Sequence, residues 1–150
     1  MSRLSSYSCA FSLPAEVEDA FKLFSDPNLL NRVTPTWFDL QPYPNQPKSL
    51  APGVEIAYRL RWRGIPLRWT SRIVDWEPPH LLTYEQAKGP YLCFRHEHLF
   101  EAEADGTRIV DKVIYRSPGG RLIDRLIAGP DLERIFKHRE QAARRMLRSL

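Results

Sequence analysis

The stretch that decides the fold runs from residue 94 to residue 115 and reads FRHEHLFEAEADGTRIVDKVIY. Apolar and polar side chains alternate on both sides of its centre, which is typical of antiparallel strands with one buried face. Asp105-Gly106, between the two runs, is a strong signal for a two-residue hairpin turn. We therefore expect a hairpin of two long strands over 91–104 and 107–117.

This turn predicts a register for the hairpin. It sets Phe100 opposite Asp111 and His98 opposite Val113, with Asp111 diagonal to His98. The apolar residues of both strands then share one face, and a slip by one residue would place them on opposite faces.

A second hairpin is expected upstream, around Gly64-Ile65. It joins strands over 54–63 and 67–76 and pairs Trp62 with Leu67 and Tyr58 with Ser71. A further strand over 80–88 lies between the two hairpins.

The flanking segments predict the helices. Residues 5–13 alternate as a strand with one buried face, Pro14 opens a helix, and a second short helix ends at Pro35. A short strand is possible at 37–41. After Pro118 the chain reads as one long helix, with a kink expected at Gly129-Pro130. Its apolar stripe comprises Leu122, Leu126, Leu132, Ile135, Phe136, Ala143, Met146 and Leu150.

These elements predict an α+β fold in a single domain over residues 1–150. A curved antiparallel sheet of six to seven strands wraps around the long C-terminal helix, and two short helices follow the first strand. The apolar face of such a sheet needs a cover, and the last helix supplies it.

Composition bounds the class of protein. The chain has 150 residues, 43% of them hydrophobic, and a formal net charge of +4. It holds no apolar run of the ~20 residues that a membrane-spanning helix needs, and residues 1–13 lack the features of a signal peptide. Cys9 and Cys93 do not form a disulfide framework, so we expect reduced thiols and a cytoplasmic location.

The chain resembles the SRPBCC, or START-like, superfamily, which has the helix-grip fold, and within it the bacterial polyketide cyclase/dehydrase-like subgroup. The resemblance rests on the segments 53–66, 75–79, 89–91, 96–100, 105–107 and 111–115 with Pro118. It implies a cavity between the sheet and the C-terminal helix. The relatives include lipid carriers, polyketide cyclases, aromatases and hormone receptors, so the fold alone does not assign a function. The Gly129-Pro130 pair departs from the continuous helix of relatives and suggests a bent lid.

Strand parity and the helix stripe predict the residues that line this cavity. They are Tyr58, Leu60, Trp62, Trp69, Ser71, Phe94, His96, His98, Phe100, Asp111, Val113, Tyr115, Phe136 and Arg139.

The polar members of the inner face stand out, because buried polar groups need partners. His96 and His98 point the same way from one strand, and Asp111 can orient His98 as a carboxylate orients a general base. The same three side chains could instead form a structural hydrogen-bond network. His-x-His on a strand is also a spacing for metal ligands, with Asp111 as the third donor, but we expect no metal and no cofactor.

Other polar residues have two interpretations. Arg139 either binds a carboxylate or phosphate at the cavity mouth or extends along the helix edge into solvent. Whether Glu85 or Gln86 points inward stays open. The basic outer sheet face is expected to be a solvated surface; it comprises Arg59, Arg61, Arg63, Arg68 and Arg72.

Three functions are compatible with these features. The first is binding, and possible carriage, of a hydrophobic or amphipathic small molecule. The second is a cyclase, dehydratase or aromatase activity, a lyase-type reaction with His96, His98, Asp111 and Tyr115 as candidate catalytic residues. The third is an interaction module that uses the basic face. We expect no nucleic-acid partner and no stable membrane insertion, and the sequence leaves the oligomeric state open.

Overall fold

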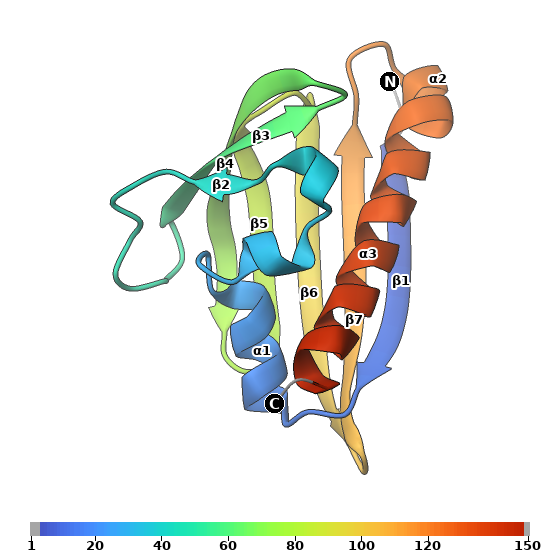
Figure 1. Ribbon diagram of the computed structural model, residues 1–150. Helices are drawn as coiled ribbons and strands as arrows, with labels where there is room; N and C mark the ends of the chain where they lie inside the picture. Colours follow the sequence, from blue (N-terminus) through green and yellow to red (C-terminus); the bar gives the residue numbers. More distant parts are fainter. Residues whose placement is uncertain (1–3, 149–150) are drawn as a thin grey trace.

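A computed structural model describes residues 4–148. Seven antiparallel strands form one sheet in the order β1-β7-β6-β5-β4-β3-β2, and the C-terminal helix crosses its concave face (Figure 1). The expected α+β helix-grip architecture is confirmed. The strands are β1 (Ser5–Leu13), β2 (Gln41–Pro42), β3 (Glu55–Trp62), β4 (Ile65–Glu77), β5 (Leu81–Lys88), β6 (Cys93–Glu103) and β7 (Gly106–Arg116).

The helices cover one face of this sheet. Between β1 and β2 lie α1 (Val17–Ser25) and two 3-10 helices, η1 (Leu30–Val33) and η2 (Thr36–Phe38), the second of which stands where a strand at 37–41 was considered. After β7 come α2 (Arg121–Ile123), the π-helical η3 (Asp124–Ala128) and α3 (Gly129–Arg148). No helix in residues 4–148 has both the length and the apolar character needed to cross a membrane.

Both predicted hairpin registers are wrong by two residues. Phe100 pairs with Ile109, and His98 pairs directly with Asp111. The turn is Ala104-Asp105 rather than Asp105-Gly106, and Gly106 already belongs to β7. A Cβ atom on Gly106 would lie 2.0 Å from the carbonyl oxygen of Leu13, so this glycine serves a close approach of β1 rather than the turn itself.

The β3–β4 hairpin differs in the same way. Trp62 pairs with Ile65 and Tyr58 with Trp69. The turn residues are Arg63 and Gly64, with φ values of +51° and +81°, as a type I′ turn requires. Because each register is displaced by an even number of residues, each side chain still lies on the face of the sheet that was predicted for it.

At Gly129-Pro130, where a kink is expected, the helical hydrogen-bonding pattern changes: the π-helical η3 ends at Ala128 and α3 begins at Gly129. Pro130 cannot donate a backbone hydrogen bond, and the N–H of Gly129 reaches back to the carbonyl oxygen of Asp124 within the π-helical turn. Such a turn carries one extra residue and rotates the preceding segment. Leu122 and Leu126 are therefore 64% and 61% exposed, contrary to the predicted apolar stripe.

The remaining stripe is confirmed where it is described. Leu132, Phe136 and Ala143 are buried, and Ile123 and Ile127 replace the two exposed leucines on the inner side. Leu150 lies outside the described residues. Cys9 and Cys93 are free thiols, as expected.

Candidate ligand cavity and the His–His–Asp cluster

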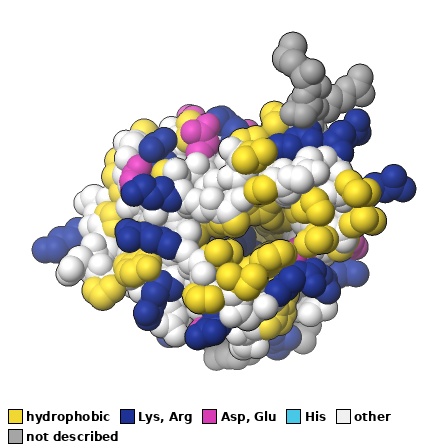
Figure 2. Space-filling model, turned by 90° about the horizontal axis from the view of Figure 1, so that it is seen from above, with side chains coloured by type: hydrophobic (Ala, Val, Ile, Leu, Met, Phe, Trp, Pro, Cys, Tyr) yellow, Lys and Arg dark blue, Asp and Glu magenta, His cyan; other side chains and the backbone are white. Residues whose placement is uncertain are grey.

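The sheet, the C-terminal helix and the loops after α1 enclose a cavity of about 410 Å³. Figure 2 shows a hollow bordered by hydrophobic side chains, with Lys and Arg side chains around it. Pockets that bind small molecules measure about 300–1,000 Å³ and are mostly apolar with a few polar groups. The size and chemistry of this cavity fall within that class.

Most of the predicted lining residues contact the cavity, but four do not. Phe100 packs against Phe21 of α1, with ring centroids 5.1 Å apart. Asp111 lies behind the two histidines, and Val113 and Tyr115 are buried in the core beneath the C-terminal helix. The predicted residues that line the cavity are Tyr58, Leu60, Trp62, Trp69, Ser71, Phe94, His96, His98, Phe136 and Arg139.

Sequence reasoning missed the contribution of the segment between β1 and β3. This segment closes one side of the cavity, but its short 3-10 helices have no periodicity from which an inner face could be read. The residues it supplies are Phe24, Leu30, Thr34, Phe38 and Leu40.

Strand β5 also contributes residues to the cavity wall. Tyr84 pairs with His96 on β6, which places both on the inner face. Gln86 pairs with Ser71 and binds the backbone of Tyr91 through both of its amide atoms, at 2.8 and 3.0 Å. The carboxylate of Glu85 binds Arg95 at 3.0 Å. Gln86 therefore lies on the inner face of the sheet with Ser71, and both Glu85 and Gln86 border the cavity.

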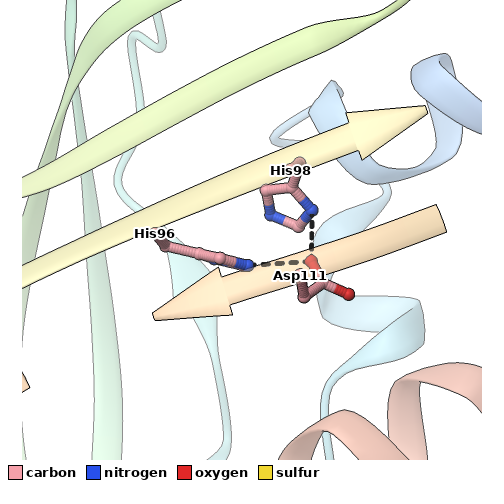
Figure 3. A group of neighbouring side chains, drawn as sticks. All are labelled: His96, His98 and Asp111. Carbon is pink, nitrogen blue, oxygen red and sulfur yellow. Dashed lines mark hydrogen bonds and ion pairs between the residues drawn. The ribbon is translucent and has the colours of Figure 1, made fainter. Parts of the chain in front are cut away.

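A buried cluster of three polar side chains forms the wall of the cavity at β6 and β7. Nε2 of His96 lies 2.9 Å from Oδ1 of Asp111, and Nδ1 of His98 lies 2.7 Å from the same oxygen (Figure 3). The first contact has the geometry of a hydrogen bond, whereas the second is a close polar contact in which the oxygen lies off the direction of the N–H bond. Sγ of Cys9 lies 3.9 Å from Oδ2 of Asp111.

The electrostatics of the cluster follow from burial and mutual contact. Burial, followed by the charge of His98, lowers the pKa of His96 from 6.5 to about 3. Burial alone would raise the pKa of Asp111, but the two imidazoles outweigh it and hold that pKa below its usual range. His96 is therefore neutral near pH 7 and donates from Nε2 to an ionised Asp111.

Two chemical uses of this cluster are open. Nδ1 of His96 and Nε2 of His98 have no hydrogen-bond partner in residues 4–148, so the two rings can accept or relay a proton from a bound molecule. The ligand atoms of His96, His98 and Asp111 also lie within 4.8 Å of one another, which is close enough to hold a cation. A cation would have to displace the contacts that now join these atoms.

Arg139, on the inner side of α3, is among the residues that line the cavity. The hollow opens at the end of the molecule that carries the β3–β4 hairpin and α2, where the C-terminal helix starts (Figures 1 and 2). Arg139 is four turns further along the helix from that start, and its guanidinium carbon lies 5.3 Å from the ring centroid of Phe136. Its Nε atom is buried without a hydrogen-bond partner. Burial lowers the pKa of Arg139, and the nearby charge of Asp111 opposes this shift.

Residues 13–144 match the protein family described as polyketide cyclase/dehydrase and lipid transport. The chain belongs to this family. A comparison with curated proteins found no match. The match over residues 13–144 confirms the SRPBCC resemblance that was inferred from the sequence segments.

Solved structures agree on the fold. Protein Ms6760 from Mycobacterium smegmatis is 13% identical, with a TM-score of 0.74 over 96% of this chain and 91% of that one. The major latex-like protein 151 from Panax ginseng is 9% identical, with a TM-score of 0.73 over 97% and 98%. CalU16 from Micromonospora echinospora is 21% identical, with a TM-score of 0.65 over 97% and 80%. At these identities the similarity establishes the fold alone.

Proposed function

We propose that this member of the polyketide cyclase/dehydrase and lipid transport family binds a hydrophobic or amphipathic small molecule in its cavity and carries it without converting it. The observation that supports this proposal is the cavity of about 410 Å³ with a largely aromatic and aliphatic lining. Filling such a cavity removes apolar surface from water, which contributes about 25 cal/mol per Å².

The polar groups of the lining support binding over catalysis. Ser71 is a potential nucleophile on the inner face, but its hydroxyl accepts a hydrogen bond from Nε1 of Trp69 at 2.9 Å. Within residues 4–148, neither His96 nor His98 forms a hydrogen bond with a serine or a cysteine. The His–Asp contacts therefore lack the paired nucleophile that covalent catalysis requires.

The experiment is a fluorescence titration with N-phenyl-1-naphthylamine, a neutral apolar probe. Leu60→Trp fills the cavity and should weaken probe binding at least about tenfold, since the added ring occupies the binding space. Arg61→Trp is the matched control, because residue 61 is exposed on the opposite face of β3. Native mass spectrometry before and after organic extraction would identify a co-purified ligand. Absence of probe binding by the folded wild-type protein, or equal binding by the two variants, contradicts the proposal.

The His–Asp cluster favours a second candidate function, a cyclase- or dehydratase-type lyase. Such a reaction needs a shaped cavity and one acid–base group, and His98 held by Asp111 can provide that group. A molecule that binds in the cavity should then be recovered after incubation with loss of water or with a closed ring, and His98→Ala should abolish the change. Recovery of every bound molecule unchanged would exclude this candidate.

The basic outer face is the weakest candidate for function. Several of its arginines are engaged with neighbouring carboxylates: Arg72 binds Glu55 at 2.9 Å, and Arg61 lies 3.8 Å from Asp39. A function of the basic face would require that the protein binds nucleic acid or anionic vesicles and that this binding weakens steeply with salt.

A further inference from the structure

The cavity contains a basic group without a matching acid. Arg139 is the one arginine or lysine in the lining, and neither an ion pair nor a hydrogen bond joins its guanidinium to any side chain in residues 4–148. Its stacking contact with the ring of Phe136 leaves the hydrogen-bond donors of the guanidinium free. The side chain is partly buried and its Nε atom is enclosed without a partner, and a desolvated charge of this kind is costly unless a partner compensates it.

The acidic residues of the lining do not compensate it. Asp131 accepts from Nε1 of Trp62 at 3.0 Å and also binds Arg63 and Arg134. Glu85 is bound by Arg95. Asp111 acts on Arg139 through space, but its close contacts are with the imidazoles of His96 and His98 and with Cys9.

Two neutral donors accompany Arg139. Tyr58 and Tyr84 line the cavity, and burial raises the pKa of both phenols well above the usual range, so both keep their protons. Neither hydroxyl makes a hydrogen bond within the described residues. The guanidinium and the two phenols line the same cavity, and the charge of Arg139 opposes the upward shift of the pKa of both phenols.

We infer that the cavity selects amphipathic monocarboxylic acids, whose carboxylate binds Arg139 at the inner end and whose apolar body fills the aromatic part towards the mouth. This inference rests on the proposed ligand-binding function and specifies its ligand class. A carboxylate matches the planar donor fork of arginine and accepts further bonds from phenols. A single positive charge balances a monoanion, whereas a dianionic phosphate monoester would bring a second, uncompensated charge into an apolar cavity.

The test uses displacement of N-phenyl-1-naphthylamine at pH 7.5 by pairs of molecules that differ only at the head. Dodecanoate is compared with dodecan-1-ol, and 2-naphthoate with 2-naphthalenemethanol. In the wild-type protein, each acid that fits should displace the probe at least about tenfold more effectively than its alcohol. The pair that shows this preference identifies an aliphatic or an aromatic body.

Variants connect the preference to Arg139. Arg139→Gln should abolish the advantage of the acid and leave the affinity of the alcohol nearly unchanged, and Arg139→Lys should keep part of the advantage. Lys137→Gln is the matched control, because Lys137 is exposed on the same helix and carries the same charge. Circular dichroism establishes that each variant is folded.

The outcomes separate the two proposals. If the probe binds but acids and alcohols compete equally in both pairs, the monocarboxylate inference is wrong and ligand binding stands. The inference is also wrong if the preference for acids persists in Arg139→Gln. If the folded wild-type protein binds neither the probe nor any of the four molecules, both the proposed ligand-binding function and the monocarboxylate inference are wrong.

Discussion

Oδ1 of Asp111 on β7 lies 2.7 Å from Nδ1 of His98, its direct partner on β6. Both side chains are almost fully buried, so the pair has no access to bulk water. This contact turns an apolar cavity wall into a polar one, and it makes the fold sensitive to the charge state of three side chains.

Asp111→Asn should destabilise the protein, because it removes the negative charge that both imidazoles contact and replaces one carboxylate oxygen with an NH2 donor. A buried polar group that loses its partner costs about 1–3 kcal/mol. We expect a decrease of this size in the free energy of unfolding, measured with urea. Asp105→Asn, in the exposed β6–β7 turn, is the control and should change it by less than about 0.5 kcal/mol. Equal effects of the two changes would show that the cluster does not stabilise the fold.

Stability should depend on pH through His96. Because its pKa is about 3 in the folded protein and 6.5 ordinarily, the unfolded chain binds more protons between these values. Stability therefore rises with pH across that range, by at most ~1.4 kcal/mol per pH unit. Asp111, whose pKa is lowered on folding, contributes stability that is present above its ordinary pKa of 3.8 and is lost as the pH falls through its folded value.

The measurement is the free energy of unfolding at several pH values from 4 to 7. His96→Gln should flatten the slope, while the corresponding change at His80, which is exposed, should preserve it. A His96→Gln protein with the wild-type slope would contradict the assignment of this dependence to the cluster.

Arg139→Met should not reduce stability and should raise it by up to about 1 kcal/mol, because the change removes a partly buried charge that has no ionic partner. Arg116→Met is the contrasting variant, since NH1 of Arg116 lies 3.7 Å from Oδ2 of the buried Asp124. Removal of that partner should cost about 3–5 kcal/mol. Thermal and urea unfolding measure both. A large loss of stability in Arg139→Met would show that Arg139 is a structural residue.

Gly106→Ala should be more damaging than Gly53→Ala. Both glycines have positive φ values, +154° and +89°. A Cβ atom at Gly53 meets nothing within 4 Å, whereas one at Gly106 meets the backbone of Leu13 at 2.0 Å. We expect about 1 kcal/mol for Gly53→Ala and at least twice that for Gly106→Ala. The comparison tests the observed register, in which Gly106 belongs to the strand.

The faces of the strands could be predicted from the sequence, but their registers could not. Alternation fixes which side chains are inside, and a displacement by two residues leaves that alternation intact. The turn signals at Gly64 and Gly106 indicate the two hairpins, but they do not indicate which two residues form each turn. That choice depends on the approach of β1 to Gly106 in one hairpin and on the positive φ of Arg63 in the other.

The candidate site was predictable to the extent that it lies on strands. His96, His98 and Asp111 follow from parity, but their arrangement around one carboxylate oxygen follows from the register. The inner residues of the C-terminal helix were misassigned at Leu122 and Leu126, because the π-helical turn changes the helical phase ahead of Gly129. The segment between β1 and β3 closes the cavity through tertiary contacts that no local pattern records.

The most direct test of a ligand cavity between the sheet and the C-terminal helix is an NMR measurement of intermolecular NOEs to bound N-phenyl-1-naphthylamine. We predict contacts from the probe to inward side chains of both walls, Trp69 on β4 and Phe136 on α3. NOEs confined to exposed side chains such as Leu122 or Ile114, with none to Trp69 or Phe136, would contradict the account.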